Sequence, residues 1–205
     1  MSRPLSSPTL FLGLFLAVAW LAGCGSPPEP ARVRAPEGKV QTRVDAAATF
    51  ADARDHDPVR EGGAVRTGED GRARLVFPDG SELAVRSDTF FEVGQGASFG
   101  RHHEGTVLYK IQKQRSGLTV ETPHAITSVL GTTFLAIVGT DSTLIGVEEG
   151  RVAVTPRAGG APVTLEAKQK LTLGPTGPLG ATEPFDLATE EFSYLKIDGK
   201  WVKPK

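Results

Sequence analysis

The feature that most constrains the fold of this chain is a long series of short alternating segments between Lys39 and Leu173. Apolar and polar residues alternate within each segment, and glycines separate one segment from the next. No window of a dozen residues in this region has a convincing period of 3.6. Many short strands separated by turns are typical of all-β proteins. The sequence therefore predicts an all-β fold, either a solenoid-like or a sandwich stack of short strands and hairpins.

Two stretches illustrate the expected strands. Alternate residues of VQTRVDAAATF, residues 40–50, would share one face of a single strand. RARLVF, residues 72–77, alternates in the same way, and Pro78-Asp79-Gly80 predicts a tight turn to a return strand at residues 83–85. Further strands are expected at residues 89–93, 106–112, 118–121, 125–129, 133–138, 144–148, 152–155, 163–165 and 170–173.

The N-terminus has the organisation of a secretory signal peptide. A short polar start with one charge, Arg3, precedes the almost wholly apolar residues 9–20, and small residues follow. A helix over residues 9–22 would be roughly 21 Å long, which is too short for a hydrocarbon core of about 30 Å. We therefore expect residues 1–23 to be a signal peptide rather than a spanning helix.

Residues 21–24, Leu-Ala-Gly-Cys, resemble the lipobox of bacterial lipoproteins. The resemblance implies cleavage between Gly23 and Cys24, a diacylglycerol on the Cys24 sulfur, and an acylated amine. Two or more acyl chains, such as palmitate, hold a protein durably at a membrane. The alternatives are a free cysteine after an ordinary signal peptide and a cysteine buried in an anchor. Cys24 is the one cysteine of the chain, so lipidation would leave no thiol for a disulfide, metal or catalysis.

The residues after the lipobox suggest a location and a spacer. An Asp at the position of Gly25 would retain a lipoprotein at the inner membrane, so its absence favours the outer membrane, facing the periplasm or the outside. Residues 24–38 are rich in proline, which favours a semi-rigid extended linker of roughly 40 Å. We expect a β-domain at residues 39–180 behind this linker.

Residues 181–205 form a C-terminal tail of different character. The stretch from Phe185 to Leu195 could form a short helix with one apolar side, and Asp198-Gly199 suits a tight hairpin. Tyr194 and Trp201 would then lie on the two strands of that hairpin. The tail either caps an open end of the β-domain or presents these two aromatic side chains to a partner.

The composition excludes several classes of function. The chain has 23 basic and 24 acidic residues, and this balance argues against a nucleic-acid partner. No phosphate-binding loop, dinucleotide fingerprint, HExxH or CxxC motif is present, so no cofactor is expected. His102-His103-Glu104 has possible metal ligands, but neighbouring residues on a strand point to opposite faces. These three residues are expected in a solvated loop, without a metal.

One stretch matches a catalytic motif. Residues 96–100, Gly-Ala-Ser-Phe-Gly, fit the GxSxG nucleophile elbow, and His124 with Glu104 or Glu121 would complete a Ser98 triad. The elbow requires a strand, a sharp turn and a helix, and no helix follows Gly100 in the sequence pattern. We expect a loop here and no enzyme, with a serine hydrolase using Ser98 as a remote alternative.

Three segments in order resemble the FecR domain. They are AVRTGEDGRARLVFPDGSELAV from Ala64, VETPHAITSVLGTTFLAIV from Val120 and VEEGRVAV from Val147. The matching residues are Thr67, Gly68, Gly71, Ala73, Leu75, Asp79, Gly80, Ser81, Val120, Thr122, Pro123, Ala125, Gly131, Thr132, Phe134, Val147, Glu149, Gly150, Val152 and Val154. The resemblance covers residues 61–173 and implies a periplasmic, solenoid-like β-domain. The motif glycines and Pro123 also have purely structural roles at bends, turns and strand starts.

The resemblance implies a regulatory rather than a catalytic role. FecR-type regulators sense an outer-membrane transporter and relay the signal to a cytoplasmic sigma factor. This sequence shows a lipobox in place of a cytoplasmic region and a spanning helix. We therefore expect a lipid-anchored module that binds an envelope protein or a glycan such as peptidoglycan, or that acts as a scaffold. The alternative is a sensor accessory that hands a signal to a sigma-factor and receptor system.

Overall fold

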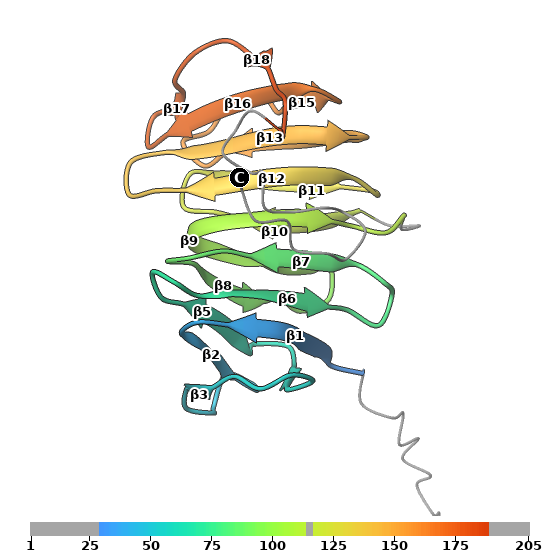
Figure 1. Cartoon of the computed structure of the whole chain (residues 1–205). Helices are drawn as coiled ribbons and strands as arrows, with labels where there is room; N and C mark the ends of the chain where they lie inside the picture. The colour runs from blue at the N-terminus through green and yellow to red at the C-terminus, as the bar shows by residue number, and fades with distance from the viewer. Residues whose placement is uncertain (1–28, 114–116, 189–205) are drawn as a thin grey trace, which may run out of the picture.

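A computed structural model describes residues 29–113 and 117–188 of the chain. Every regular element in these residues is a β-strand, and the strands lie across the long axis of the molecule in successive layers (Figure 1). The chain climbs this stack from one end to the other. The all-β prediction, with a stack of short strands and hairpins, is confirmed.

The strands form two facing sheets. Sheet A contains, in spatial order, β4 (Pro58–Val59), β1 (Ala31–Glu37), β6 (Arg72–Val76), β7 (Glu82–Val85), part of β9 (Ser98–Lys110), β12 (Thr133–Val138), β13 (Thr143–Glu149) and β16 (Gln169–Gly174), and β16 also pairs with β17 (Gly177–Pro178) and β18 (Glu183–Pro184). Sheet B contains β3 (Ala51–Asp52), β2 (Val40–Arg43), β5 (Ala64–Thr67), β8 (Phe90–Val93), the other part of β9, β10 (Leu118–Glu121), β11 (Ala125–Val129), β14 (Arg151–Pro156) and β15 (Val163–Glu166).

Strand β9 belongs to both sheets. Its first half pairs with β8 and β10 in sheet B, and its second half pairs with β7 and β12 in sheet A. The change of sheet falls at Gly105, whose φ is +89°. A Cβ at this position would lie 2.3 Å from Thr89 Oγ1 and 2.4 Å from the Asp88 carbonyl oxygen, so the crossing requires glycine.

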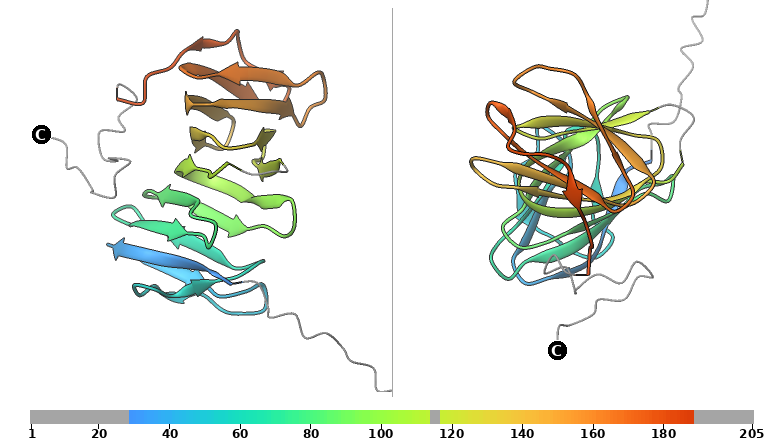
Figure 2. Two further views of the ribbon diagram at one scale, coloured as in Figure 1. Left: turned by 90° about the vertical axis from the view of Figure 1, so that its right-hand side faces the viewer. Right: turned by 90° about the horizontal axis from the view of Figure 1, so that it is seen from above.

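After β9, the chain alternates hairpins between the two sheets. The pair β10 and β11 lies in sheet B, β12 and β13 in sheet A, and β14 and β15 in sheet B. Seen along the stack, successive layers superimpose around a common interior (Figure 2). Neighbouring strands are antiparallel, except that β10 runs parallel to β9.

The core fills the space between the sheets. Alternate residues of each strand point inward, as the period of two in the sequence predicts. Fully buried examples from both sheets are Val33, Leu75, Tyr109, Phe134, Leu173, Val65, Phe91, Val120, Val152 and Leu165. Burial of each such aliphatic or aromatic side chain contributes about 1.5–3 kcal/mol. This continuous interior holds the layers together.

The structure differs from the expected single strand at residues 40–50. Strand β2 ends at Arg43, and β3 begins at Ala51. Between them, the Asp45 carboxylate accepts hydrogen bonds from the backbone N–H groups of Ala47 and Ala48, both at 3.0 Å. An Asp side chain that bonds the backbone two and three residues later stabilises a turn in place of a strand.

The structure also differs from the expected linker at residues 31–37. These residues form β1, which pairs with β6 from Arg32 to Arg34 and again at Glu37. The ladder is interrupted between Arg34 and Glu37, where Ala35 has a φ of +47°. Pro36 lies in this interruption, where its missing N–H costs no ladder hydrogen bond. The extended geometry that proline favours is used here by a strand of the fold.

The C-terminal tail lies partly outside the described residues. Phe185 and Leu187, which were expected in a short helix, follow β18 in non-helical backbone, and both side chains are buried. The rest of the expected helix and hairpin, with Tyr194 and Trp201, lies outside the described residues.

Candidate binding groove

A groove of about 530 Å³ opens at one side of the N-terminal half of the stack. Its floor includes Phe77 from the turn after β6, Phe99 from the start of β9 and Leu118 from the start of β10. The rings of Phe77 and Phe99 lie 4.5 Å apart between centroids. Phe77 and Leu118 are only half buried, so the groove offers apolar surface to a ligand. A concave apolar surface with a few polar groups is the usual form of a binding site.

The rim of the groove is mainly acidic. Glu29, Asp45, Glu61 and Asp79 line it together with one cation, Arg60. Asp79 accepts hydrogen bonds from the N–H and the hydroxyl of Ser81, at 2.8 Å and 2.9 Å, and Asp45 is used in its own turn. Glu29 and Glu61 are exposed and have no hydrogen bond or ion pair to another described residue. These two carboxylates are therefore available to a ligand.

Ser98, the residue of the GxSxG motif, lines this groove at the first position of β9. The motif was expected in a loop, but residues 98–110 form β9, and every regular element after it in the described residues is a strand. Within the described residues, no histidine or carboxylate contacts the Ser98 hydroxyl. A nucleophile elbow needs a base within hydrogen-bond distance and a helix behind the serine. The arrangement does not activate Ser98.

His124 has a structural partner in place of a catalytic one. It lies at the corner between β10 and β11, 5% exposed, and its Nδ1 is 2.9 Å from Thr143 Oγ1. Thr122 closes the same corner, because its hydroxyl accepts a hydrogen bond from the Ala125 N–H at 3.0 Å. Pro123 lies between these residues. The conformation of this corner, rather than a reaction, explains a histidine here.

His102 and His103 point to opposite sides of β9, as the strand geometry predicts. The expectation of a solvated loop was wrong: residues 102–104 are part of the strand, and His102 is fully buried in the core. His103 is exposed and stacks on Phe90 at 4.6 Å between ring centroids. Glu104 is exposed on the same strand. Among the described residues, no group of three or more possible ligands is arranged to hold a metal ion.

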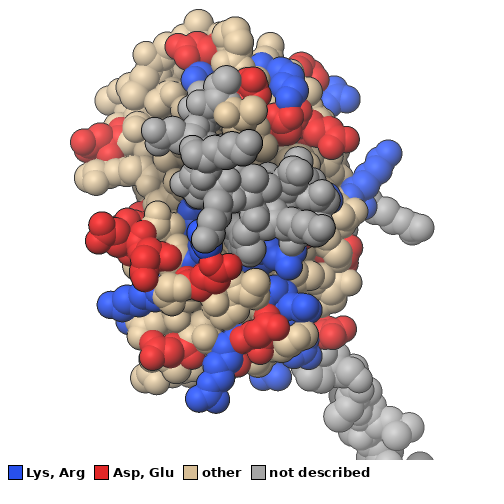
Figure 3. All heavy atoms as spheres, viewed as in Figure 1, with Lys and Arg blue, Asp and Glu red and all other residues tan. Residues whose placement is uncertain are grey.

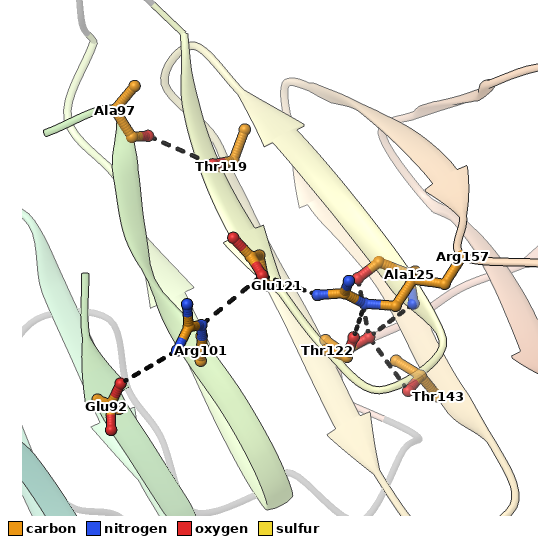
Figure 4. A network of polar contacts seen from close by, with 9 residues as sticks. All are labelled: Glu92, Ala97, Arg101, Thr119, Glu121, Thr122, Ala125, Thr143 and Arg157. Carbon is orange, nitrogen blue, oxygen red and sulfur yellow. Dashed lines mark hydrogen bonds and ion pairs between the residues drawn. The ribbon is translucent and has the colours of Figure 1, made fainter. Parts of the chain in front are cut away.

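A ladder of alternating charges crosses the outer face of sheet B (Figure 4). Arg43 contacts Glu92 at 2.5 Å, and Arg101 lies 3.6 Å from Glu92 and 3.8 Å from Glu121. Arg157 completes the ladder with a 2.8 Å contact to Glu121. Because each carboxylate has a cation on both sides, the ladder is satisfied internally. This face therefore offers little net charge to a partner.

Charges are also mixed on the opposite side of the molecule. Figure 3 shows basic and acidic side chains interspersed over the face that includes the outer side of sheet A. No broad field of one sign is visible there, in agreement with the near balance of charge in the sequence.

Four of the residues singled out in the sequence lie outside the described residues. They are the cleavage position Gly23, the lipid-attachment position Cys24, and the aromatic residues Tyr194 and Trp201. In the part of the chain that the structure describes, no helix is long and apolar enough to cross a membrane. The sequence reasoning missed the groove, because its floor comes from three strand ends that only the fold brings together.

Comparisons with known proteins agree with the motif resemblance. The family model described as "FecR protein" matches residues 63–153, which run from the residue before β5 into β14. No curated protein matches the chain. The fold is similar to two crystal structures, at 1.65 Å and 2.50 Å resolution, of a protein from Parabacteroides distasonis ATCC 8503 provisionally described as an anti-sigma factor.

Each solved structure has 15% sequence identity and a TM-score of 0.54, and the alignment covers 61% of this chain and 61% of the solved chain. The chain thus matches about three fifths of the length of that relative, and at this identity the likeness shows the fold alone. Residues 63–153 of this all-β chain are similar to FecR proteins.

Proposed function

We propose that this protein is a non-catalytic binding module of the bacterial cell envelope. It is held at the outer membrane by lipid on Cys24 and faces the periplasm, where it binds a partner protein. The FecR match over residues 63–153 supports a regulatory class rather than an enzyme. The groove beside Phe77 and Phe99 supports binding, because it combines an apolar floor with two unpaired carboxylates.

The chemistry of the groove favours a particular kind of partner segment. A half-buried aromatic floor takes up apolar side chains, and the free carboxylates of Glu29 and Glu61 favour a cation beside them. The complementary ligand is a peptide segment that carries an apolar residue next to Lys or Arg. A neutral glycan would use the aromatic floor but would leave the carboxylates without a counter-charge.

The proposal rests on the unpaired carboxylates of Glu29 and Glu61 in the groove. Crosslinking in intact cells tests it. A photoreactive residue replaces Gln95, an exposed residue of the groove lining, so that Glu29 and Glu61 stay in place. A control chain carries the same residue at Thr164, which is exposed on β15 away from the groove. We expect a protein adduct from the Gln95 position and none from the Thr164 position. Adducts at both positions alike, no adduct at Gln95, or peptidoglycan fragments alone would contradict the protein-binding groove.

A second role, as a sensor accessory to a sigma-factor and receptor system, is favoured by the FecR match itself. In this role the partner in the groove would be a membrane protein that carries the signal onward. Deletion of the protein should then change transcription from a sigma-dependent promoter, and restoring the wild-type chain should reverse the change. If transcription is unchanged while the Gln95 position still forms its protein adduct, the binding proposal stands and the signalling role is contradicted.

A further inference from the structure

A second apolar cluster lies on the outer face of sheet A, away from the core. Ala84, Leu108 and Leu135 stand side by side on β7, β9 and β12, because Ala84 is paired with Leu108 and Leu108 with Leu135. Their neighbours along the strands that point inward belong to the main core. These side chains point away from the space between the two sheets, so the main core cannot bury them. A contiguous apolar row on an outer face is normally covered by another part of the protein or by a partner.

The segment after β18 supplies part of this cover. Phe185 and Leu187 belong to the same outer apolar cluster, defined here as Ala84, Leu108, Leu135, Phe185 and Leu187. The Phe185 N–H donates a 2.8 Å hydrogen bond to the Lys168 carbonyl, which brings the segment back onto the sheet.

The pairing of β12 with β13 places a glycine where the Phe185 ring packs on the sheet. Gly146 on β13 is paired with Leu135, and a Cβ at Gly146 would lie 2.4 Å from the Phe185 ring. The absence of a side chain at Gly146 therefore leaves the space in which the ring lies. Phe185 thus extends the row by one strand, from β12 to β13.

Two side chains are too few to cover the whole row. From β7 to β13 the row crosses three strand spacings, about 14 Å at roughly 4.8 Å each. Ala84 lies at the far end of it, yet Ala84 and Leu108 are only 7% and 5% exposed. Phe185 and Leu187 lie outside the sheet and are themselves 3% and 8% exposed. Their burial requires another layer of polypeptide over the outer apolar cluster.

We propose that residues 189–205 of the same chain form this layer. The described chain ends at Ala188, one residue after Leu187, so the remaining residues start at the edge of the cluster. They contain Phe192, Leu195, Ile197 and Trp201, and an extended chain advances about 3.3 Å per residue, which spans the row several times over. The tail therefore docks on the outer face of sheet A and does not cap an open end of the stack.

Crosslinking within the molecule tests the position of the tail. In the full chain, a photoreactive residue replaces Thr106, which lies on the outer face of β9 two residues from Leu108; a control chain carries it at Thr164 on β15. Mass spectrometry should find an adduct between position 106 and residues 189–205 of the same molecule, and none from position 164. An adduct to a second copy, an adduct to another protein, or no adduct to the tail at position 106 would overturn the proposal.

Substitutions in the tail give a readout that leaves the sheets untouched. Replacing Phe192, Leu195, Ile197 and Trp201 by Ser should expose the outer apolar cluster, because Ser cannot replace their apolar contacts. The fluorescence of an apolar dye, anilinonaphthalene sulfonate, should then rise several-fold, as it should in a chain that stops at Ala188. The control, Lys196→Ser with Lys200→Ser, should bind no more dye than the wild type. Equal dye binding by all four proteins would overturn the proposal.

Discussion

His102 is the one fully buried histidine among the described residues, and it lies inside the core. Neither ring nitrogen makes a hydrogen bond of normal geometry, and the nearby backbone of Glu104 and Gly105 offsets the effect of burial only in part. Phe91 and Tyr109 surround it, with ring centroids at 6.5 Å and 6.2 Å. Burial lowers the pKa of His102 to about 3 from an ordinary value of 6.5. Burial also raises the pKa of the neighbouring Tyr109, so neither group is charged in the folded protein near neutral pH.

The depressed pKa of His102 predicts acid sensitivity. Between pH 6.5 and about 3 the unfolded chain binds a proton at His102 that the folded chain does not, so stability falls as the pH falls through this range. At pH 4.5 the loss is roughly 2–3 kcal/mol relative to pH 7.5. Urea unfolding at the two pH values measures it, and His102→Leu should flatten the dependence. His103→Leu, on the exposed side of β9, should keep the wild-type slope; equal slopes for wild type and His102→Leu would refute the assignment.

We expect that adding one methyl group at Gly105 lowers the stability of the fold strongly. Gly105→Ala places a Cβ within 2.4 Å of Thr89 and Asp88 at a φ of +89°, and we expect a loss of at least about 2 kcal/mol. Gly96→Ala is the matched control, because its φ is +61° but its Cβ would meet nothing within 4 Å. The difference between the two variants in urea unfolding isolates the steric part, and an equal loss in both would attribute the whole effect to backbone strain.

At the scale of the elements, the two sheets differ in how their outer faces are stabilised. Sheet B has the charge ladder, in which Glu121 lies between Arg101 and Arg157, whereas the outer face of sheet A has an apolar row. The Arg157 guanidinium also donates a 2.7 Å hydrogen bond from Nε to the Thr122 carbonyl. Arg157 thus ties the end of β14 to the corner that His124 occupies.

Arg157→Lys should lower stability by about 1 kcal/mol, because Lys cannot make the contacts with Glu121 and Thr122 at the same time. The control is Arg151→Lys, whose guanidinium is 74% exposed and lies 4.0 Å from Glu166, and it should change stability by less than about 0.3 kcal/mol. Thermal unfolding at low and high salt measures both. If the two substitutions lower the free energy of unfolding by the same amount, the double contact of the Arg157 guanidinium with Glu121 and Thr122 does not contribute to stability.

How far the sequence predicts the elements depends on the local signal at each. The β6–β7 hairpin was predictable, because Asp79-Gly80 fixes the turn and Leu75 and Leu83 alternate on either side of it. The first half of β9 was not predictable, because residues 101–104 are all polar and the one that points into the core is a histidine, His102. Strand β1 was missed because proline suits both a linker and an interrupted strand.

The candidate groove could not be predicted from the sequence, for a different reason. Phe77, Phe99 and Leu118 belong to three separate strand ends, and their proximity depends on β9 lying in sheet B beside β10. That parallel pair joins segments that no hairpin signal connects. Ser98 was noted for a motif and lies in the groove, but as a lining residue of a strand.

At the scale of the whole molecule, the position of β1 changes the expected distance from the membrane. The fold begins at Ala31, so only residues 25–30 separate Cys24 from the first strand. At about 3.1 Å per residue an extended spacer of this length reaches under roughly 20 Å. With lipid on Cys24, the groove beside Glu29 would therefore lie close to the lipid headgroups.

Lipid attachment itself is testable in cells. We expect radiolabelled palmitate to be incorporated into the wild-type chain and the protein to fractionate with the outer membrane. Cys24→Ser should lose the label and leave the membrane fraction, because the sulfur that would carry the diacylglycerol is gone. A control change at the neighbouring Ser26→Ala should retain both properties. An unlabelled wild type, or membrane association that survives Cys24→Ser, would refute the anchor.

The shared strand β9 also determines how this polypeptide can be divided. A break before Ser98 would separate β9 from β7 and β8, and a break after Lys110 would separate it from β10 and β12. Either break therefore removes one neighbour of β9 in each sheet. The FecR-like segment 63–153 likewise omits β1, which pairs with β6, and β16, which pairs with β13. Recombinant fragments cut at either boundary should be insoluble, so the smallest autonomous unit is the complete stack.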